Sequence, residues 1–180
     1  MDTELDRILA SDFLAGVDRR PVSELRQLRS ECQAVETQLS YLRRMVQGRH
    51  DIVAGEIERR RGGGDPLDVS DLVDRLPSIL ADRIHAPGPG RLPASMEPGE
   101  LTGRLAEQLD AITDAVPIES PGDAADAALD QVAEQLHALE QEVSGFRRQL
   151  FERIDTLQAE ITRRYRDGDA QVDDVLSGGG

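Results

Sequence analysis

Residues 25–53 read LRQLRSECQAVETQLSYLRRMVQGRHDIV, and their apolar side chains recur mainly at alternating steps of three and four residues. This spacing is typical of a helix whose single apolar stripe packs along a second helix in a coiled coil. No proline interrupts the segment between Ser23 and Arg61, and three arginines followed by three glycines end it. Residues 21–61 are therefore predicted to form one long helix. The stripe comprises Leu25, Leu28, Cys32, Val35, Leu39, Leu42, Val46 and Val53.

A second apolar stripe of similar length lies within residues 123–165. A lone helix would leave such a stripe in water, and two helices of equal length can cover each other. The sequence therefore predicts an all-α fold built on a long antiparallel two-helix coiled coil within one chain. Homodimerisation is the second choice. The second stripe comprises Leu129, Val132, Leu136, Leu139, Val143, Phe146, Leu150, Ile154, Leu157 and Ile161.

Shorter helices are predicted before and between the two long ones. Residues 1–20 carry apolar side chains at helical spacing and predict a short helix that ends near Gly16. Such a helix either packs on the coiled coil or is offered to a partner as a helix for a groove. The connector, residues 62–122, is richer in glycine and proline. Within it, two amphipathic helices are predicted at residues 67–84 and 100–116.

The charge balance of the chain excludes some partners. It has 35 acidic residues and 21 basic ones, all of them arginine, and its formal net charge is −14. Direct DNA binding is not expected, because it depends on a net basic face. A basic protein partner fits this charge better. The acidic and glycine-rich end, residues 166–180, is predicted to be disordered.

Cysteine and histidine usage does not indicate a disulfide or a metal site. The single cysteine, Cys32, lies within the first apolar stripe, and His50, His85 and His137 are far apart in the sequence. No stretch approaches the 18 or so apolar residues of a membrane span, and the acidic N-terminus lacks the basic start of a signal peptide. We therefore expect a cytoplasmic protein that needs no metal and does not bind a membrane.

One polar motif accompanies both apolar stripes. Its spacing in the first helix is E-x3-S-x2-R-x3-Q-x3-D, and the same spacing recurs in the second helix with phenylalanine in place of glutamine. Steps of four and three residues put all five members on one face, next to the apolar stripe. Four repeated identities argue against coincidence. The members are Glu36, Ser40, Arg43, Gln47 and Asp51, and then Glu140, Ser144, Arg147, Phe151 and Asp155.

These residue types suit the recognition of a guanine nucleotide. The guanidinium group of arginine can donate two hydrogen bonds to guanine O6 and N7, or bind a phosphate. An aspartate accepts hydrogen bonds and can take the hydrogens of guanine N1 and N2. The motif comes without a positioned nucleophile, a histidine–carboxylate pair or a glycine-rich phosphate loop. The pattern therefore favours a binding protein and not an enzyme.

The doubled motif resembles the signature of the RsiG family, actinobacterial anti-sigma factors that are armed by cyclic-di-GMP. The first copy matches at all five positions, and the second departs only at Phe151. The resemblance implies an antiparallel coiled coil on which the ten motif residues hold cyclic-di-GMP as a dimer. It also implies that the loaded protein sequesters the sporulation sigma factor WhiG from RNA polymerase and so represses sporulation genes.

Two other interpretations remain open at this point. The chain can be a structural coiled-coil adaptor or scaffold without a ligand, whose polar stripes only set the pairing register. A nucleotide-processing enzyme is a distant third, because the catalytic groups are missing. If the protein binds cyclic-di-GMP, Phe151 is expected to supply apolar contact in place of a hydrogen bond, and the second motif is expected to stay functional.

Overall fold

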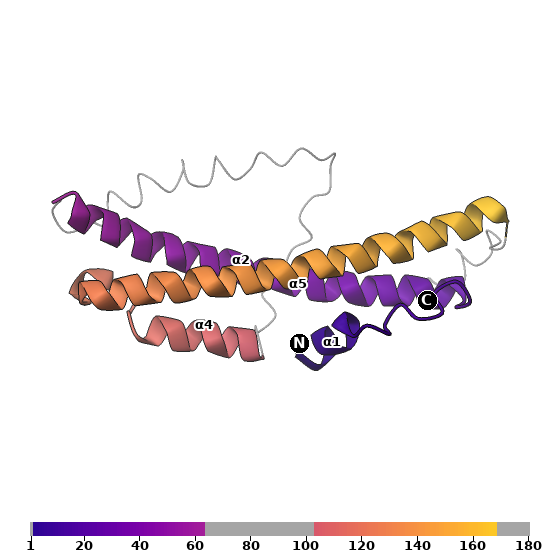
Figure 1. The fold of residues 1–180 in the computed structure, drawn as a ribbon, viewed down its shortest axis with the longest axis horizontal. Helices are drawn as coiled ribbons and strands as arrows, with labels where there is room; N and C mark the ends of the chain where they lie inside the picture. Colours follow the sequence, from indigo (N-terminus) through magenta and orange to yellow (C-terminus); the bar gives the residue numbers. More distant parts are fainter. Residues whose placement is uncertain (1, 64–102, 169–180) are drawn as a thin grey trace.

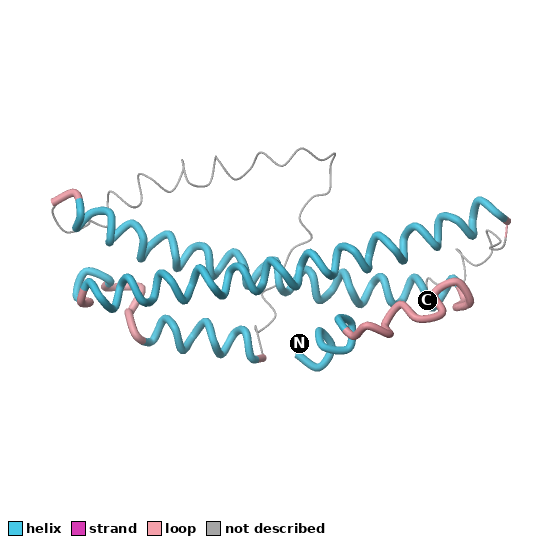
Figure 2. Tube along the Cα trace, viewed as in Figure 1, coloured by secondary structure: helices cyan, strands magenta, loops and turns pink. Residues whose placement is uncertain are grey.

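The computed structural model describes residues 2–63 and 103–168, and every regular element in these ranges is helical (Figures 1 and 2). The long helices are α2 (Val22–Arg61) and α5 (Asp126–Asp167), with 40 and 42 residues. At 1.5 Å per residue each is about 60 Å long. The shorter elements are α1 (Asp2–Leu9), α4 (Arg104–Asp114) and a 3₁₀ turn, η1 (Pro121–Asp123). The all-α prediction is confirmed.

Helices α2 and α5 pair in antiparallel orientation (Figure 1). At one end Arg26 donates a hydrogen bond to the Tyr165 hydroxyl at 2.6 Å. At the other end Arg61 lies 3.4 Å from the carboxylate of Asp130. All eight residues of the first predicted stripe are buried, and so are eight of the second. Phe146 and Ile154 are only partly buried and pack against the same core.

The apolar stripe of α2 contains Cys32, which is fully buried. Burial raises the pKa of its thiol to about 11, so the reactive thiolate is suppressed at neutral pH. Cys32 is therefore a small core residue in this helix pair.

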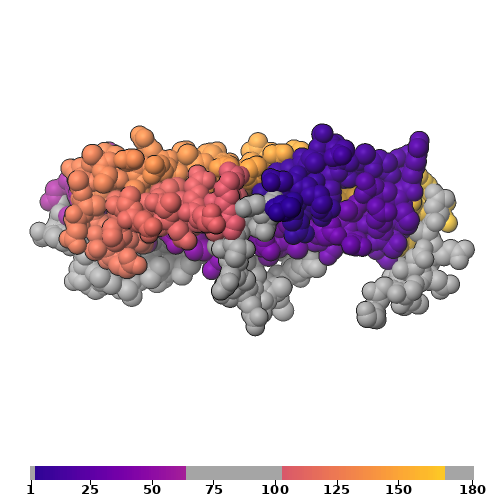
Figure 3. All heavy atoms as spheres, turned by 90° about the horizontal axis from the view of Figure 1, so that it is seen from below, coloured from indigo at the N-terminus to yellow at the C-terminus, as the bar shows by residue number. Residues whose placement is uncertain are grey.

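Helices α1 and α4 cover one face of the pair (Figures 1 and 3). Helix α1 contributes Leu5 and Ile8 to the core. Helix α4 contributes Leu105 and Leu109, and Arg49 of α2 donates a 3.0 Å hydrogen bond to the hydroxyl of Thr113. Both short helices thus add apolar contacts on the same side of the coiled coil.

The first short helix is shorter than its apolar spacing predicts. It ends at Leu9 and not near Gly16, and turns follow as far as Arg19. Arg153 of α5 donates hydrogen bonds of 2.6 and 2.9 Å to the carbonyls of Ile8 and Leu9. The last carbonyl groups of a helix lack hydrogen-bond donors within the helix, and Arg153 supplies donors to two of them here. The helix can therefore end at Leu9 without another turn.

The start of the second long helix also differs from the prediction. Helix α5 begins at Asp126, three residues later than expected, because residues 121–123 form η1. The carbonyl of Gly122 accepts a 2.8 Å hydrogen bond from Arg60. Glu56 of α2, which is 1% exposed, holds Arg60 and Arg59 at 2.6 Å. This cluster joins the end of α2 to the start of α5.

The other end of α5 extends to Asp167, where Gly168 adopts a left-handed conformation, so it is two residues longer than predicted. The last fifteen residues were predicted to be disordered, and all but three of them lie outside the described residues. The helix predicted at residues 67–84 lies outside them as well. The second connector helix is present as α4, with described bounds inside the predicted range 100–116.

Candidate functional site

The polar motifs lie on the face of the coiled coil opposite the two short helices. On α2, Glu31 contacts α1 and Arg49 contacts α4. On α5, Arg153 contacts α1 and Glu142 contacts α4. Counting about 3.6 residues per turn, the motif side chains project nearly opposite to these contact residues on both helices. Among the described residues, the motif face is therefore left uncovered by α1 and α4.

The antiparallel pairing brings the two motifs together in a reciprocal way. Arg43 of the first motif donates from Nε to Glu140 Oε1 of the second at 2.7 Å. Arg147 of the second motif donates from Nε and Nη2 to Glu36 Oε1 of the first, at 3.0 and 2.9 Å. Each arginine therefore binds the glutamate of the other helix, as an approximate two-fold axis between the helices requires.

The serines and the glutamine complete this cluster. Ser40 donates to Glu36 at 2.7 Å, and Ser144 donates to Glu140 at 2.9 Å, each along its own helix. Gln47 donates a longer hydrogen bond, 3.4 Å, to Glu140. Each motif glutamate thus accepts hydrogen bonds from its own helix and from the opposite one.

The two glutamate carboxylates are partly buried in this cluster, with side chains 17% (Glu36) and 16% (Glu140) exposed. Burial raises the pKa of Glu140, but the hydrogen bonds from Arg43 and Ser144 outweigh it, and the pKa lies below its usual value. Glu140 is therefore ionised at neutral pH and fixes the guanidinium of Arg43.

This arrangement orients Arg43 for further binding. The bond from Arg43 to Glu140 uses Nε, so the two Nη groups at the end of the guanidinium are not engaged by that glutamate. These terminal groups are the ones that bind guanine O6 and N7 or a phosphate side by side. Because the carboxylate already fixes the arginine through Nε, less side-chain entropy is lost when a ligand binds the Nη groups.

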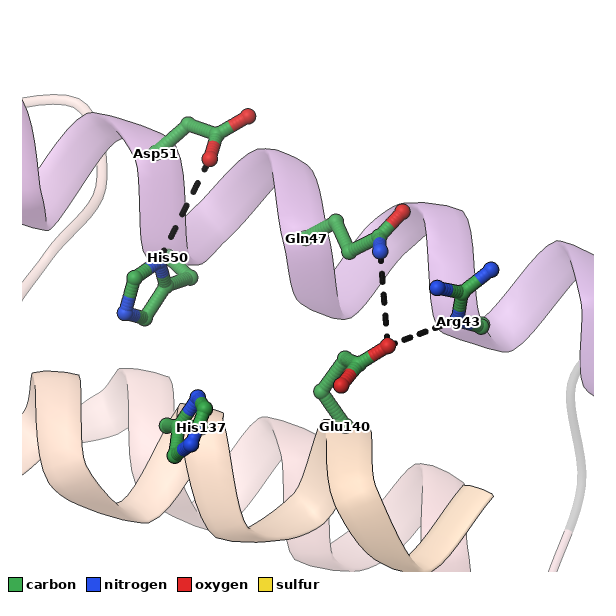
Figure 4. Close-up of a pocket in the computed structure, with 6 residues that line it drawn as sticks. All are labelled: Arg43, Gln47, His50, Asp51, His137 and Glu140. Carbon is green, nitrogen blue, oxygen red and sulfur yellow. Dashed lines mark hydrogen bonds and ion pairs between the residues drawn. The ribbon is translucent and has the colours of Figure 1, made fainter. Parts of the chain in front are cut away.

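A pocket of about 310 Å³ opens next to Arg43 on the motif face (Figure 4). This volume lies in the range of small-molecule sites. Residues of the first motif line its α2 side, and Glu140 and a histidine line its α5 side. We call this set the first half-site; it consists of Arg43, Gln47, His50, Asp51, His137 and Glu140.

Two histidines in the first half-site are absent from the predicted site. The ring centroids of His50 and His137 are 6.3 Å apart, and His50 Nδ1 lies 4.0 Å from Asp51 Oδ1. They are far apart in the sequence, and only the antiparallel register brings them together. Two local signals could have indicated these histidines: His50 directly precedes Asp51, and His137 lies three residues before Glu140 on the same helical face (Figure 4).

The second motif has a different surface. Phe151 occupies the position of the glutamine, and its side chain is 45% exposed. The guanidinium carbon of Arg147 lies 5.6 Å from the centre of the Phe151 ring, a cation–π distance. Asp155 is exposed at the outer end of this motif, as Asp51 is at the outer end of the first. The structure therefore gathers the central members of both motifs and leaves the two aspartates at opposite ends.

The described residues offer a binding surface and no metal centre. In residues 2–63 and 103–168, histidine, cysteine and carboxylate side chains do not gather in threes around a point that could hold a metal ion. None of the helices in these ranges combines the length and apolar composition needed to cross a membrane. What the motif face does provide is two oriented guanidinium groups with amide, imidazole and carboxylate groups around them.

The described residues thus form a helical hairpin with a doubled polar motif on the face that α1 and α4 leave uncovered. A family model described as RsiG-like matches residues 11–80 and 117–178, which is most of the chain and includes both motifs. The chain belongs to the RsiG-like family. No curated protein matches it. Family membership points to an anti-sigma factor, a regulator with a sigma factor as partner and a nucleotide as ligand.

Proposed function

We propose that this protein binds cyclic-di-GMP on its motif face and, when loaded, sequesters a WhiG-type sigma factor from RNA polymerase. Transcription of sporulation genes is then repressed. The ligand contacts come from Glu36, Ser40, Arg43, Gln47 and Asp51 of α2 and from Glu140, Ser144, Arg147, Phe151 and Asp155 of α5. The protein acts in the cytoplasm, where its partner works.

The observation that carries this proposal is the reciprocal pairing of the two motifs. Arg43 binds Glu140 and Arg147 binds Glu36, so the central polar cluster has approximate two-fold symmetry. Cyclic-di-GMP is itself two-fold symmetric, and a dimer of it offers guanine edges and phosphates to both arginines. The ligand can bind Arg43 without breaking its bond to Glu140, because both Nη groups of Arg43 are outside that bond. Arg147 binds Glu36 through Nε and Nη2, so its Nη1 is the group outside that pair.

The charge of the chain supports a basic partner. With a net charge of −14, the protein attracts positively charged surfaces at long range and repels nucleic acid. A sigma factor binds DNA and RNA polymerase, so it carries basic surfaces that this chain can cover. The bound dinucleotide adds phosphates to the motif face and strengthens the same attraction.

The test is calorimetry of the purified full chain with cyclic-di-GMP, alone and with a WhiG-type sigma factor. We expect Arg43→Ala and Asp51→Ala each to weaken ligand-dependent sigma binding by about 1–3 kcal/mol, the value of one bidentate base contact. The matched control is Arg44→Ala, which removes an exposed arginine next to the motif but outside it. Circular dichroism of the variants should match the parent, since all three residues lie outside the apolar stripe.

One specific observation favours the scaffold alternative, namely that the Arg–Glu pairs would also fix the register of a coiled coil without a ligand. The same calorimetry separates the two functions. A protein that binds the sigma factor equally well with and without cyclic-di-GMP, and with Arg43 and Arg147 both replaced by alanine, would be a ligand-independent adaptor.

A further inference from the structure

Besides Gln47 and Phe151, the two halves of the motif face differ at two positions, and both differences involve a histidine. His50 directly precedes Asp51 in the first motif, and the residue that precedes Asp155 in the second is Ile154. His137 lies three residues before Glu140, and the residue three positions before Glu36 is Gln33. The approximate two-fold axis that relates the motifs thus relates an imidazole pair to an isoleucine and a glutamine.

Both imidazoles face the first half-site. They come from opposite helices, His50 from α2 and His137 from α5, and their ring centroids lie 6.3 Å apart at an interplanar angle of 47° (Figure 4). Both line the same 310 Å³ pocket as Arg43 and Gln47. The side chain of His50 is 35% exposed, and His137 is exposed, so a ligand in the pocket can reach both rings.

We propose that His50 and His137 form an anion-binding subsite for a phosphate group of the nucleotide, present in the first half-site only, and that ligand binding there takes up protons. This inference rests on the proposed function and adds two residues to the motif as ligand contacts. It also makes the two halves of a symmetric ligand site unequal: the first is imidazole-lined, and the second is apolar around Phe151.

The charges around the imidazoles explain why protonation of the rings should favour phosphate binding. From α2 the pocket receives the guanidinium of Arg43 and the carboxylate of Asp51, and from α5 it receives the carboxylate of Glu140. Glu134, one turn before His137, adds an exposed acid nearby. With neutral imidazoles the lining carries more negative than positive charge, which opposes a phosphate. Each proton taken up by an imidazole reverses part of this balance and adds a charged hydrogen-bond donor.

The direction of the pH dependence follows from linkage. A phosphate attracts a protonated imidazole more strongly than a neutral one, so protons favour the ligand complex over the free protein. Imidazole is the side chain that changes charge between pH 5 and 8. Affinity for cyclic-di-GMP should therefore rise as the pH falls from 8 to 6.

The experiment is calorimetry of the full chain with cyclic-di-GMP at pH 6.0 and 8.0, each in two buffers of different ionisation enthalpy so that protons taken up are counted. The variants are His50→Gln and His137→Gln, alone and together, which keep a neutral polar side chain. The matched control is Gln33→Ala at the position related to His137. Circular dichroism at both pH values checks that each variant stays helical, as expected for residues outside the buried stripe.

We expect the parent protein and Gln33→Ala to bind more tightly at pH 6.0 with net proton uptake. Each histidine variant should lose a part of that difference and bind more weakly at pH 6.0, and the variant with both substitutions should lose most of it. If the affinity for cyclic-di-GMP changes neither with pH nor with either histidine substitution, this inference is wrong and the proposed function still stands. Absence of cyclic-di-GMP binding by the parent at either pH, with and without the sigma factor, would overturn the proposed function itself.

Discussion

The Arg147–Glu36 pair allows a direct test of how the two motifs hold each other. Arg147 donates two hydrogen bonds to Glu36 Oε1, and the side chains are 20% and 17% exposed. The corresponding pair, Arg43 and Glu140, has one such bond, and Arg43 is 35% exposed. The Arg147–Glu36 pair has the more buried arginine and one more hydrogen bond, so it should contribute more to stability than the Arg43–Glu140 pair.

The expected magnitude lies between two limits. Exposed ion pairs contribute about 0.2–1 kcal/mol, and net hydrogen bonds to charged groups contribute about 1.5–3 kcal/mol. We therefore expect a coupling energy of about 1–2 kcal/mol for Arg147 with Glu36. For Arg43 with Glu140 we expect about 1 kcal/mol or less, because solvent screens the more exposed guanidinium.

The assay is a double-mutant cycle measured by urea unfolding at neutral pH, using Arg147→Met and Glu36→Gln, and then Arg43→Met and Glu140→Gln. Methionine keeps the apolar stem of each arginine in contact with its neighbours. The control cycle combines Arg43→Met with Glu36→Gln, two residues that the structure does not pair, and should give a coupling below about 0.5 kcal/mol. Equal couplings in all three cycles would refute the reciprocal pairing described above.

Three further predictions concern the core, the second motif and the end of the hairpin. Leu39→Asp or Val143→Asp should unfold the helix pair, because each puts a charge at a fully buried position, and circular dichroism would detect the loss. Phe151→Gln should change cyclic-di-GMP affinity only mildly in calorimetry, because the side chain is exposed and the neighbouring motif members remain. Hydrogen bonds from two arginines outweigh the effect of burial and lower the pKa of Glu56 from 4.5 to about 2. Its contribution of about 2–3 kcal/mol should persist above pH 4.5 and disappear towards pH 2, so Glu56→Gln should destabilise the protein in urea at pH 7 and hardly at pH 2.

The long helix pair could be predicted from the sequence because its signal is repeated over many turns. Apolar residues at steps of three and four extend from Leu25 to Val53 and from Leu129 to Ile161, and the antiparallel pairing buries them. One residue that departs from this spacing does not change the prediction of a long helix. Helix ends depend on single contacts, and so they were predicted less accurately.

The differences at the helix ends have a common physical cause. Arg153 binds carbonyl groups at the end of α1, and Arg60 binds the carbonyl of Gly122 before α5. Each is a contact between segments far apart in the sequence, so local patterns do not contain it. Glu56 continues the spacing of the apolar stripe from Val53. Because glutamate is usually exposed, its burial could not be predicted from the sequence.

The candidate site could be predicted in part for the same reasons. The motif repeats on both helices, so its ten positions could be picked out from the repeated residue types and their spacing, and their role as ligand contacts stays a prediction. His50 and His137 became neighbours only once the register of the hairpin was known. The pairing of each arginine with the opposite glutamate also required that register, since the sequence shows only that both helices carry both residue types.

The reciprocal Arg–Glu contacts join two segments of the chain that a long connector separates. The proposed ligand site requires the closed hairpin, so a nucleotide bound there would oppose its opening. At a free concentration one hundred times the dissociation constant, this linkage adds about 2.7 kcal/mol to the closed form. Proteases cleave chains that open, so the lifetime of the protein in the cell would follow the level of its ligand. Under the proposed function, a fall in cyclic-di-GMP would release the sigma factor and also shorten the lifetime of its inhibitor, which would make the release difficult to reverse.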